Sequence, residues 1–204
     1  MKKIKNFKIN LRQREILRLL KATSKVSEIT PQLEDAVKQE VERLQKEIKP
    51  SAVYETVTGE SMVSGLSGEI PKESVAATLY IVTINTSIGL DIRSASERGE
   101  NILANVLHCL AIEALEQTIN FVQRLVADEA KSEACEISAR KNIDSKPVLE
   151  KIFKLLPGEK VGVSIAQQND LLPSDKGALS PLYSSCGVMP WVPVKKQSSK
   201  SSAN

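Results

Sequence analysis

The side chains most able to do chemistry are few in this 204-residue sequence, and they lie far apart. The single histidine, His108, is followed by Cys109 and, five residues further on, by Glu113. A metal site needs two or three such ligands on one face of a helix, and a spacing of five places His108 and Glu113 on different faces. The residues therefore predict no metal site, and His108 is expected to lie buried or at the boundary of a helix-borne core.

Two short segments contain parts of known catalytic motifs without completing them. Gly65-Leu66-Ser67-Gly68 has the first half of the Gly-x-Ser-x-Gly turn of serine hydrolases, but Glu69 stands where the last glycine belongs. Cys186 has no basic neighbour before Lys195, so the sequence offers nothing that would activate its thiol. No catalytic residue is predicted, and the sequence leaves open whether the protein is an enzyme.

One long helix, expected from Gly99 to Ala130, must position most other elements. Apolar residues recur along it at steps of one, three and four, which gives a helix with a wide covered face. Leu79–Ile84 is a near-continuous apolar run that predicts a central strand covered on both sides. Further helices are expected over residues 11–21, 31–48, 86–97 and 148–156.

The remaining segments have the alternation and turn residues of strands. These are expected over residues 52–58, 133–139, 161–165 and 178–184. Asp144 or Ser145 is the expected N-cap of the helix that stops at Pro157. Strands and helices come in unequal groups rather than in strict alternation, so the predicted fold class is α+β.

The net charge of +3 arises from the two ends of the chain. Residues 1–8 hold four lysines and residues 195–204 hold three, with no acid in either stretch, so the body between them is mildly acidic. Nucleic-acid binding by that body is not expected. The predicted organisation is a basic N-terminal arm over 1–9, a single domain over 10–190 and a disordered Ser/Lys-rich tail over 191–204.

Cysteine usage and hydropathy bear on the compartment. The three cysteines are far apart and odd in number, which favours a reducing environment over a disulfide framework. No stretch is expected to approach membrane-spanning length, and the start of the chain lacks the apolar region of a signal peptide. The sequence therefore predicts a cytoplasmic protein that does not contact a membrane.

The order of these segments resembles the activation domain of cobalamin-dependent methionine synthase, and especially its free-standing bacterial relatives. The likeness covers most of residues 11–185, in pattern and order more than in identity. It implies an α+β fold in which a mainly antiparallel, twisted sheet packs against long helices. The segments that carry it are Glu15–Leu20, Ile48-Lys49-Pro50, Ala52–Glu55, Thr78–Ile84, Ser87–Ile92, the long helix, Lys160–Ser164 and Leu171–Lys176.

In that family the domain binds S-adenosylmethionine through an Arg-x-x-x-Gly-Tyr signature. The matching stretch here begins with Arg140, but Asp144 replaces the glycine and Ser145 replaces the tyrosine. Glycine lets the backbone approach a ligand closely, and the aromatic ring supplies an apolar face and a hydroxyl. The resemblance therefore implies a degraded S-adenosylmethionine site, with Arg140 and Asp144 as the remaining candidate cofactor-binding residues.

The family's domain also docks on a corrinoid domain, whose inactive Co(II) is reduced and remethylated. The resemblance implies a partner or accessory subunit of a corrinoid-dependent methyltransferase, which assists reductive reactivation or docks near the partner's cobalamin without using S-adenosylmethionine. Pro173 and Lys176, in the turn before the last strand, are the candidate docking residues. Any enzymatic role would belong to such a methyltransferase system. The alternative is a stand-alone small-molecule-binding protein or enzyme of unrecognised activity.

Overall fold

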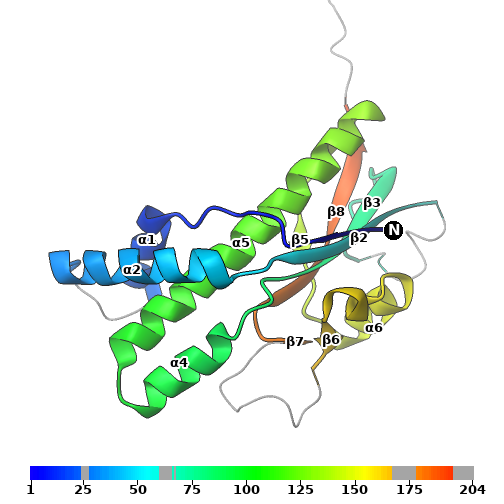
Figure 1. Cartoon of the computed structure of the whole chain (residues 1–204). Helices are drawn as coiled ribbons and strands as arrows, with labels where there is room; N and C mark the ends of the chain where they lie inside the picture. Colours follow the sequence, from blue (N-terminus) through cyan, green and yellow to red (C-terminus); the bar gives the residue numbers. More distant parts are fainter. Residues whose placement is uncertain (24–27, 60–65, 67, 167–177, 195–204) are drawn as a thin grey trace, which may run out of the picture.

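The computed structural model describes residues 1–23, 28–59, 66, 68–166 and 178–194, and Figure 1 shows their arrangement. The helices are α1 (Gln13–Thr23), α2 (Pro31–Glu47), α4 (Ile88–Glu97), α5 (Asn101–Ser132), α6 (Lys146–Leu155) and the 3-10 turn η1 (Gly158–Val161). The strands are β1 (Lys2–Lys5), β2 (Ser51–Thr58), β3 (Ala76–Thr83), β4 (Cys135–Ile137), β5 (Lys141–Asn142), β6 (Ser164–Ile165), β7 (Leu179–Ser180) and β8 (Ser184–Pro193).

The main sheet has six strands, and every pairing in it is antiparallel. Its order is β1-β2-β3-β8-β4, and β5 also pairs with β8. β6 and β7 form a separate two-stranded ladder. An α+β fold with a mainly antiparallel sheet and long helices is therefore confirmed.

The central strand β3 is buried along its whole length because both faces of the sheet are covered. Its even-numbered residues Ala76, Tyr80 and Val82 contact the C-terminal half of α5. Its odd-numbered apolar residues share a second core with α6 and η1 on the other face. This two-residue alternation follows from the pleat of a strand, and it explains why the segment reads as a continuous apolar run.

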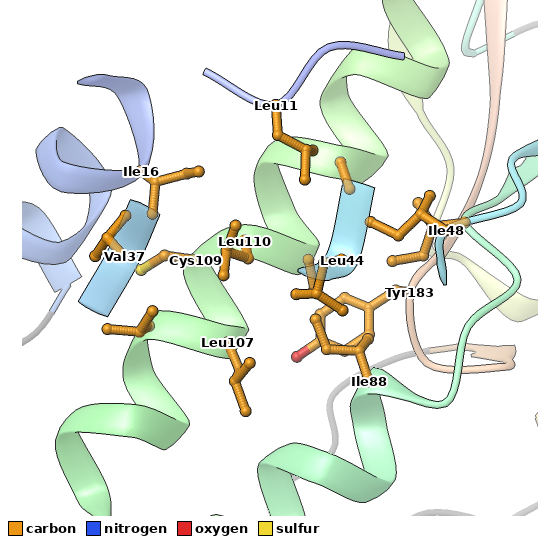
Figure 2. Close-up of a cluster of buried hydrophobic side chains, with 14 of the residues drawn as sticks. Leu11, Ile16, Val37, Leu44, Ile48, Ile88, Leu107, Cys109, Leu110 and Tyr183 are labelled. Carbon is orange, nitrogen blue, oxygen red and sulfur yellow. The ribbon is translucent and has the colours of Figure 1, made fainter. Parts of the chain in front are cut away.

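The N-terminal half of α5 packs against helices instead of strands. Figure 2 shows this helical core, in which Leu110 on α5 lies among side chains from α1 and α2 and near Tyr183. Thr30 is the N-cap of α2, and its side chain accepts a hydrogen bond from the backbone N–H of Leu33 at 3.3 Å. The long helix thus joins a helical core at one end to the sheet at the other (Figure 1).

Both ends of the expected domain differ from the prediction. Residues 1–9 were expected to form a basic arm, but Lys2–Lys5 forms β1 and pairs with β2 at the edge of the sheet. Residue 190 was expected to end the domain, but β8 continues through Trp191 to Pro193. Lysine-rich segments suit sheet edges, since their charges keep the open edge in water.

Two further expectations need correction. Residues 161–165 were expected to form one strand, but Val161 ends the turn η1, and Gly162 adopts a left-handed φ of 75° before the two-residue strand β6. No stretch was expected to have membrane-spanning length, yet α5 is long enough and apolar enough to cross a membrane when only its length and composition are considered. More than half of its most apolar segment is buried inside the fold, as in the core helix of a soluble protein.

Candidate functional site

Arg140, the first residue of the expected ligand signature, lies between β4 and β5 with its guanidinium against α5. Its Nη2 donates to both carboxylate oxygens of Glu116, at 2.7 and 2.6 Å. Its Nη1 donates to Asn120 Oδ1 at 2.9 Å and to Gln123 Oε1 at 3.3 Å. Spacings of four and three put these acceptors on one face of α5. The protein thus supplies Arg140 with the planar carboxylate that a ligand would otherwise offer.

The residues after Arg140 tie the same corner to the sheet. Asn142 on β5 accepts a hydrogen bond from the Tyr80 hydroxyl at 2.6 Å. Burial is the main reason that the pKa of Tyr80 is raised to about 12, while the positive charge of Arg140 acts in the opposite direction. Gly187 on β8 permits this approach, because a Cβ there would lie 2.5 Å from the Lys141 carbonyl oxygen and 2.6 Å from Tyr80 Cζ.

Asp144 and Ser145 occupy the positions of the family's glycine and tyrosine. Both are exposed, and the N-cap of α6 is Ser145, so Asp144 is not the cap that was considered for it. Ser145 makes no side-chain capping hydrogen bond. Burial, and secondarily the negative charge of Asp144, raises the pKa of Cys186 to about 12. Cys186 is therefore a buried, protonated thiol of the sheet and not an activated nucleophile.

The other candidate segments lie partly or wholly outside the described residues. Pro173 and Lys176 belong to the undescribed stretch 167–177, and Gly65 and Ser67 of Gly65-Leu66-Ser67-Gly68 are also undescribed. Their roles remain predictions from the sequence. The structure therefore describes the environment of Arg140 and Asp144 alone, and the predicted docking turn lies outside the described residues.

His108 and Glu113 have separate partners on different sides of α5. The Nδ1 atom of His108 lies 2.7 Å from the Tyr183 hydroxyl. His108 is exposed as a residue, whereas the sequence predicted a buried or boundary position, and the partial burial of its ring lowers the pKa of the imidazole. The buried carboxylate of Glu113 accepts from Arg12 Nε at 2.7 Å and from Gln117 Nε2 at 2.9 Å. Within the described part of the chain, no three His, Cys, Asp or Glu residues gather as a metal site requires.

A cavity that the sequence did not predict lies where β3 ends and α4 begins. It has a volume of about 460 Å³ and is also lined by the segment Pro181–Tyr183, which leads into β8. Two chain segments that are distant in sequence form it, residues 83–96 and residues 181–183, so no local motif marks the whole cavity. The one available signal was the change from the apolar run of β3 to the polar residues Asn85, Thr86 and Ser87.

Comparison with known proteins identifies the fold and nothing narrower. No protein-family model matches the chain, and no curated protein matches it. Among solved structures, the chain is similar to a crystal structure of the MetH reactivation domain bound to AdoHcy, with a TM-score of 0.61. The match covers 96% of this chain and 79% of that chain at 11% sequence identity. The two proteins therefore share a fold across nearly all of this chain.

Proposed function

We propose that the protein is a cytoplasmic partner of a corrinoid-dependent methyltransferase that docks on the corrinoid-carrying domain. The observation that carries this proposal is the likeness to the MetH reactivation domain over 96% of the chain. The likeness takes in the helical core, the sheet and α6 together, and not a common substructure alone. A fold can host unrelated functions, so the proposal depends on the direct binding test given below.

We further propose that the protein does not use S-adenosylmethionine as a working ligand. The Nη2 atom of Arg140 already donates to both oxygens of the Glu116 carboxylate, and its Nη1 atom donates to two side-chain amide oxygens of α5. A ligand carboxylate would have to displace Glu116. Asp144 adds a second negative charge at the position where the family has glycine. Both features disfavour an anionic group at this corner.

The docking face in this proposal consists of residues 140–145 and the sequence segment 171–176. The exposed side chains of Lys141, Asp144 and Ser145 give the described part of that face a polar surface. A transient complex has a small polar interface, so we expect a dissociation constant no tighter than micromolar, about 8 kcal/mol of binding free energy or less.

The test is direct binding to corrinoid proteins. The full chain is titrated into each corrinoid protein encoded in the source genome, purified with cob(II)alamin bound, and association is followed by calorimetry and by the visible spectrum of the corrinoid. We expect micromolar or weaker association with at least one of them, accompanied by a spectral change. The absence of binding to every such protein would contradict the proposal.

Charge reversal then locates the face. Asp144→Lys and Lys176→Glu are expected to change the affinity at least fivefold, whereas Lys38→Glu and Lys46→Glu on exposed positions of α2 are expected to leave it unchanged. Figure 1 shows α2 beside α1 and α5, on the opposite side of the picture from α6. Equal effects from both pairs would indicate general electrostatic attraction and would remove the support for a specific docking face.

A further inference from the structure

The cavity at the junction of β3 and α4 has the size of a small-molecule site. Its volume of about 460 Å³ lies within the range of 300–1,000 Å³ that is usual for ligand pockets. Its walls are of two kinds. Ile84, Ile92 and the ring of Tyr183 supply apolar surface, while the main polar groups come from Asn85, Thr86 and Ser87.

Charge distinguishes this cavity from an ordinary surface depression. Arg93 is the only charged side chain among the described residues that line it, and no carboxylate lines it. Arg12, Arg18, Arg43, Arg98 and Arg140 each form an ion pair. Arg93, like Arg14 and Arg124, forms no ion pair within the described part of the chain, and of these three arginines it is the one that lines the cavity. The acid nearest to it in sequence, Asp91, is bonded to Arg43 Nη1 at 3.3 Å.

The apolar walls continue to the rim of the cavity. Leu90 is 63% exposed and Leu182 is 40% exposed, and both line the cavity. The hydroxyl of Tyr183 is engaged by His108, so the tyrosine offers the cavity its ring. Figure 2 shows that ring among the side chains of the helical core, near Ile88. An apolar ligand group that covered Leu90 and Leu182 would remove apolar surface from water, which is favourable.

We infer that this cavity binds a small organic carboxylate that carries a short apolar group. A guanidinium with no carboxylate of its own matches a planar carboxylate through two parallel hydrogen bonds. A single positive charge balances a monoanion, whereas a phosphate carries nearly two negative charges and would meet only one cation here. The apolar walls account for the remainder of such a ligand. This site is separate from the Arg140 corner and requires no corrinoid partner.

The probes are phenylacetate and 4-methylpentanoate, each compared by calorimetry with its neutral amide, phenylacetamide or 4-methylpentanamide. The full-length protein is expected to bind at least one carboxylate ten times more tightly than the matched amide. Arg93→Gln is expected to abolish that preference. Arg98→Gln is the matched control, because Arg98 ends the same helical segment, does not line the cavity and is paired with Glu100 at 2.7 Å. It should retain the preference.

A second variant tests the cavity itself. A Cβ added at Gly89, which lines the cavity, would meet no atom within 4 Å, so a side chain can begin there without a clash at its first atom. Gly89→Phe is expected to reduce carboxylate binding at least tenfold, and Gly89→Ala to reduce it less than threefold, with both variants retaining the wild-type circular dichroism spectrum. The inference is overturned if neither carboxylate is preferred over its amide, if Arg93→Gln keeps the preference, or if Gly89→Phe keeps the affinity.

Discussion

The corner at Arg140 and the cavity at Arg93 contain the same cationic group in opposite circumstances. Arg140 is bonded to Glu116 and two amides of α5, and its side chain is only 22% exposed. Arg93 lines an open cavity and forms no ion pair with a carboxylate of the described residues. An arginine with a built-in carboxylate is a structural tie, while one without it is available to a ligand. The family resemblance pointed to Arg140, and the structure directs attention to Arg93.

Each region also contains a buried tyrosine whose hydroxyl has a polar partner. In the Arg140 corner the Tyr80 hydroxyl donates to Asn142 at 2.6 Å. Beside the cavity the Tyr183 hydroxyl lies 2.7 Å from His108 Nδ1. In the Arg140 corner the group that titrates is Tyr80 itself, with a raised pKa, whereas beside the cavity it is His108, with a lowered pKa. The stability contribution of the first region is therefore expected to change at alkaline pH and that of the second at acid pH.

The largest expected effect concerns α5, on which both regions depend. Leu110 is fully buried in the helical core. Leu110→Ala is expected to destabilise the protein by about 2–5 kcal/mol, the usual cost of a cavity left by a core leucine. Leu155→Ala, at a position that is 46% exposed, should cost much less. Urea denaturation measures both, and a loss below 2 kcal/mol for Leu110→Ala would contradict the packing of this face.

The next effect belongs to the Arg140 corner at alkaline pH. Because the pKa of Tyr80 is about 12 in the folded state and about 10 in the unfolded chain, the unfolded chain loses its proton first. The stabilisation is fully present below pH 10 and is lost as the pH rises toward 12, and it amounts to roughly 1–3 kcal/mol. Unfolding free energies at pH 9.5 and 11.5 should differ more for wild type than for Tyr80→Phe, and equal differences would contradict the burial of Tyr80.

A smaller effect compares the two arginines directly. Arg140→Met is expected to cost about 1–2 kcal/mol, since it breaks several hydrogen bonds of a half-buried group, and the 40% exposure of Glu116 limits the loss. Arg93→Met should change the stability by less than about 0.5 kcal/mol, because Arg93 is exposed and forms no ion pair within the described residues. Equal costs in chemical denaturation would remove the distinction between a structural tie and an available cation.

The smallest effect belongs to the cavity side at acid pH. Partial burial lowers the pKa of His108, so the folded protein resists protonation more than the unfolded chain does. The stabilisation is therefore full above pH 6.5 and declines as the pH falls through the lower folded-state pKa. Because the chain has one histidine, a single imidazole NMR titration gives the value. A midpoint at or above 6.5 would show that the ring is not desolvated as described.

The elements with strong apolar periodicity could be predicted from the sequence, and those defined by pairing could not. Leu79–Ile84 predicted β3 because both faces of that strand are covered. β1 escaped prediction because three of its four residues are lysines and only Ile4 is half-buried. An edge strand that faces water can carry charged side chains at most positions, and a run of lysines then shows no apolar alternation from which a strand could be predicted.

β8 escaped prediction because it contains prolines, which are usually excluded from central strands. Pro190 is tolerated because its missing N–H falls at a gap between two neighbours of β8. The β4 ladder ends at Ile137 opposite Trp191, and the β5 ladder begins at Lys141 opposite Val188. In that gap the Pro190 carbonyl accepts from the backbone N–H of Ser138. The partners of Arg140 could not be predicted from the sequence either, because no spacing rule links Arg140 to Glu116, which lies 24 residues away.

The most direct test of the account is the affinity of the wild-type protein for S-adenosylmethionine, measured by isothermal titration calorimetry. Because Glu116 occupies Arg140 and Asp144 adds a negative charge, we predict a dissociation constant weaker than millimolar, less than about 4 kcal/mol of binding free energy. Restoring the family residues with Asp144→Gly and Ser145→Tyr should strengthen binding, and no gain would contradict the alignment of Arg140 with the signature. Micromolar binding by the wild-type protein would contradict the claim that its arginine is closed to ligands.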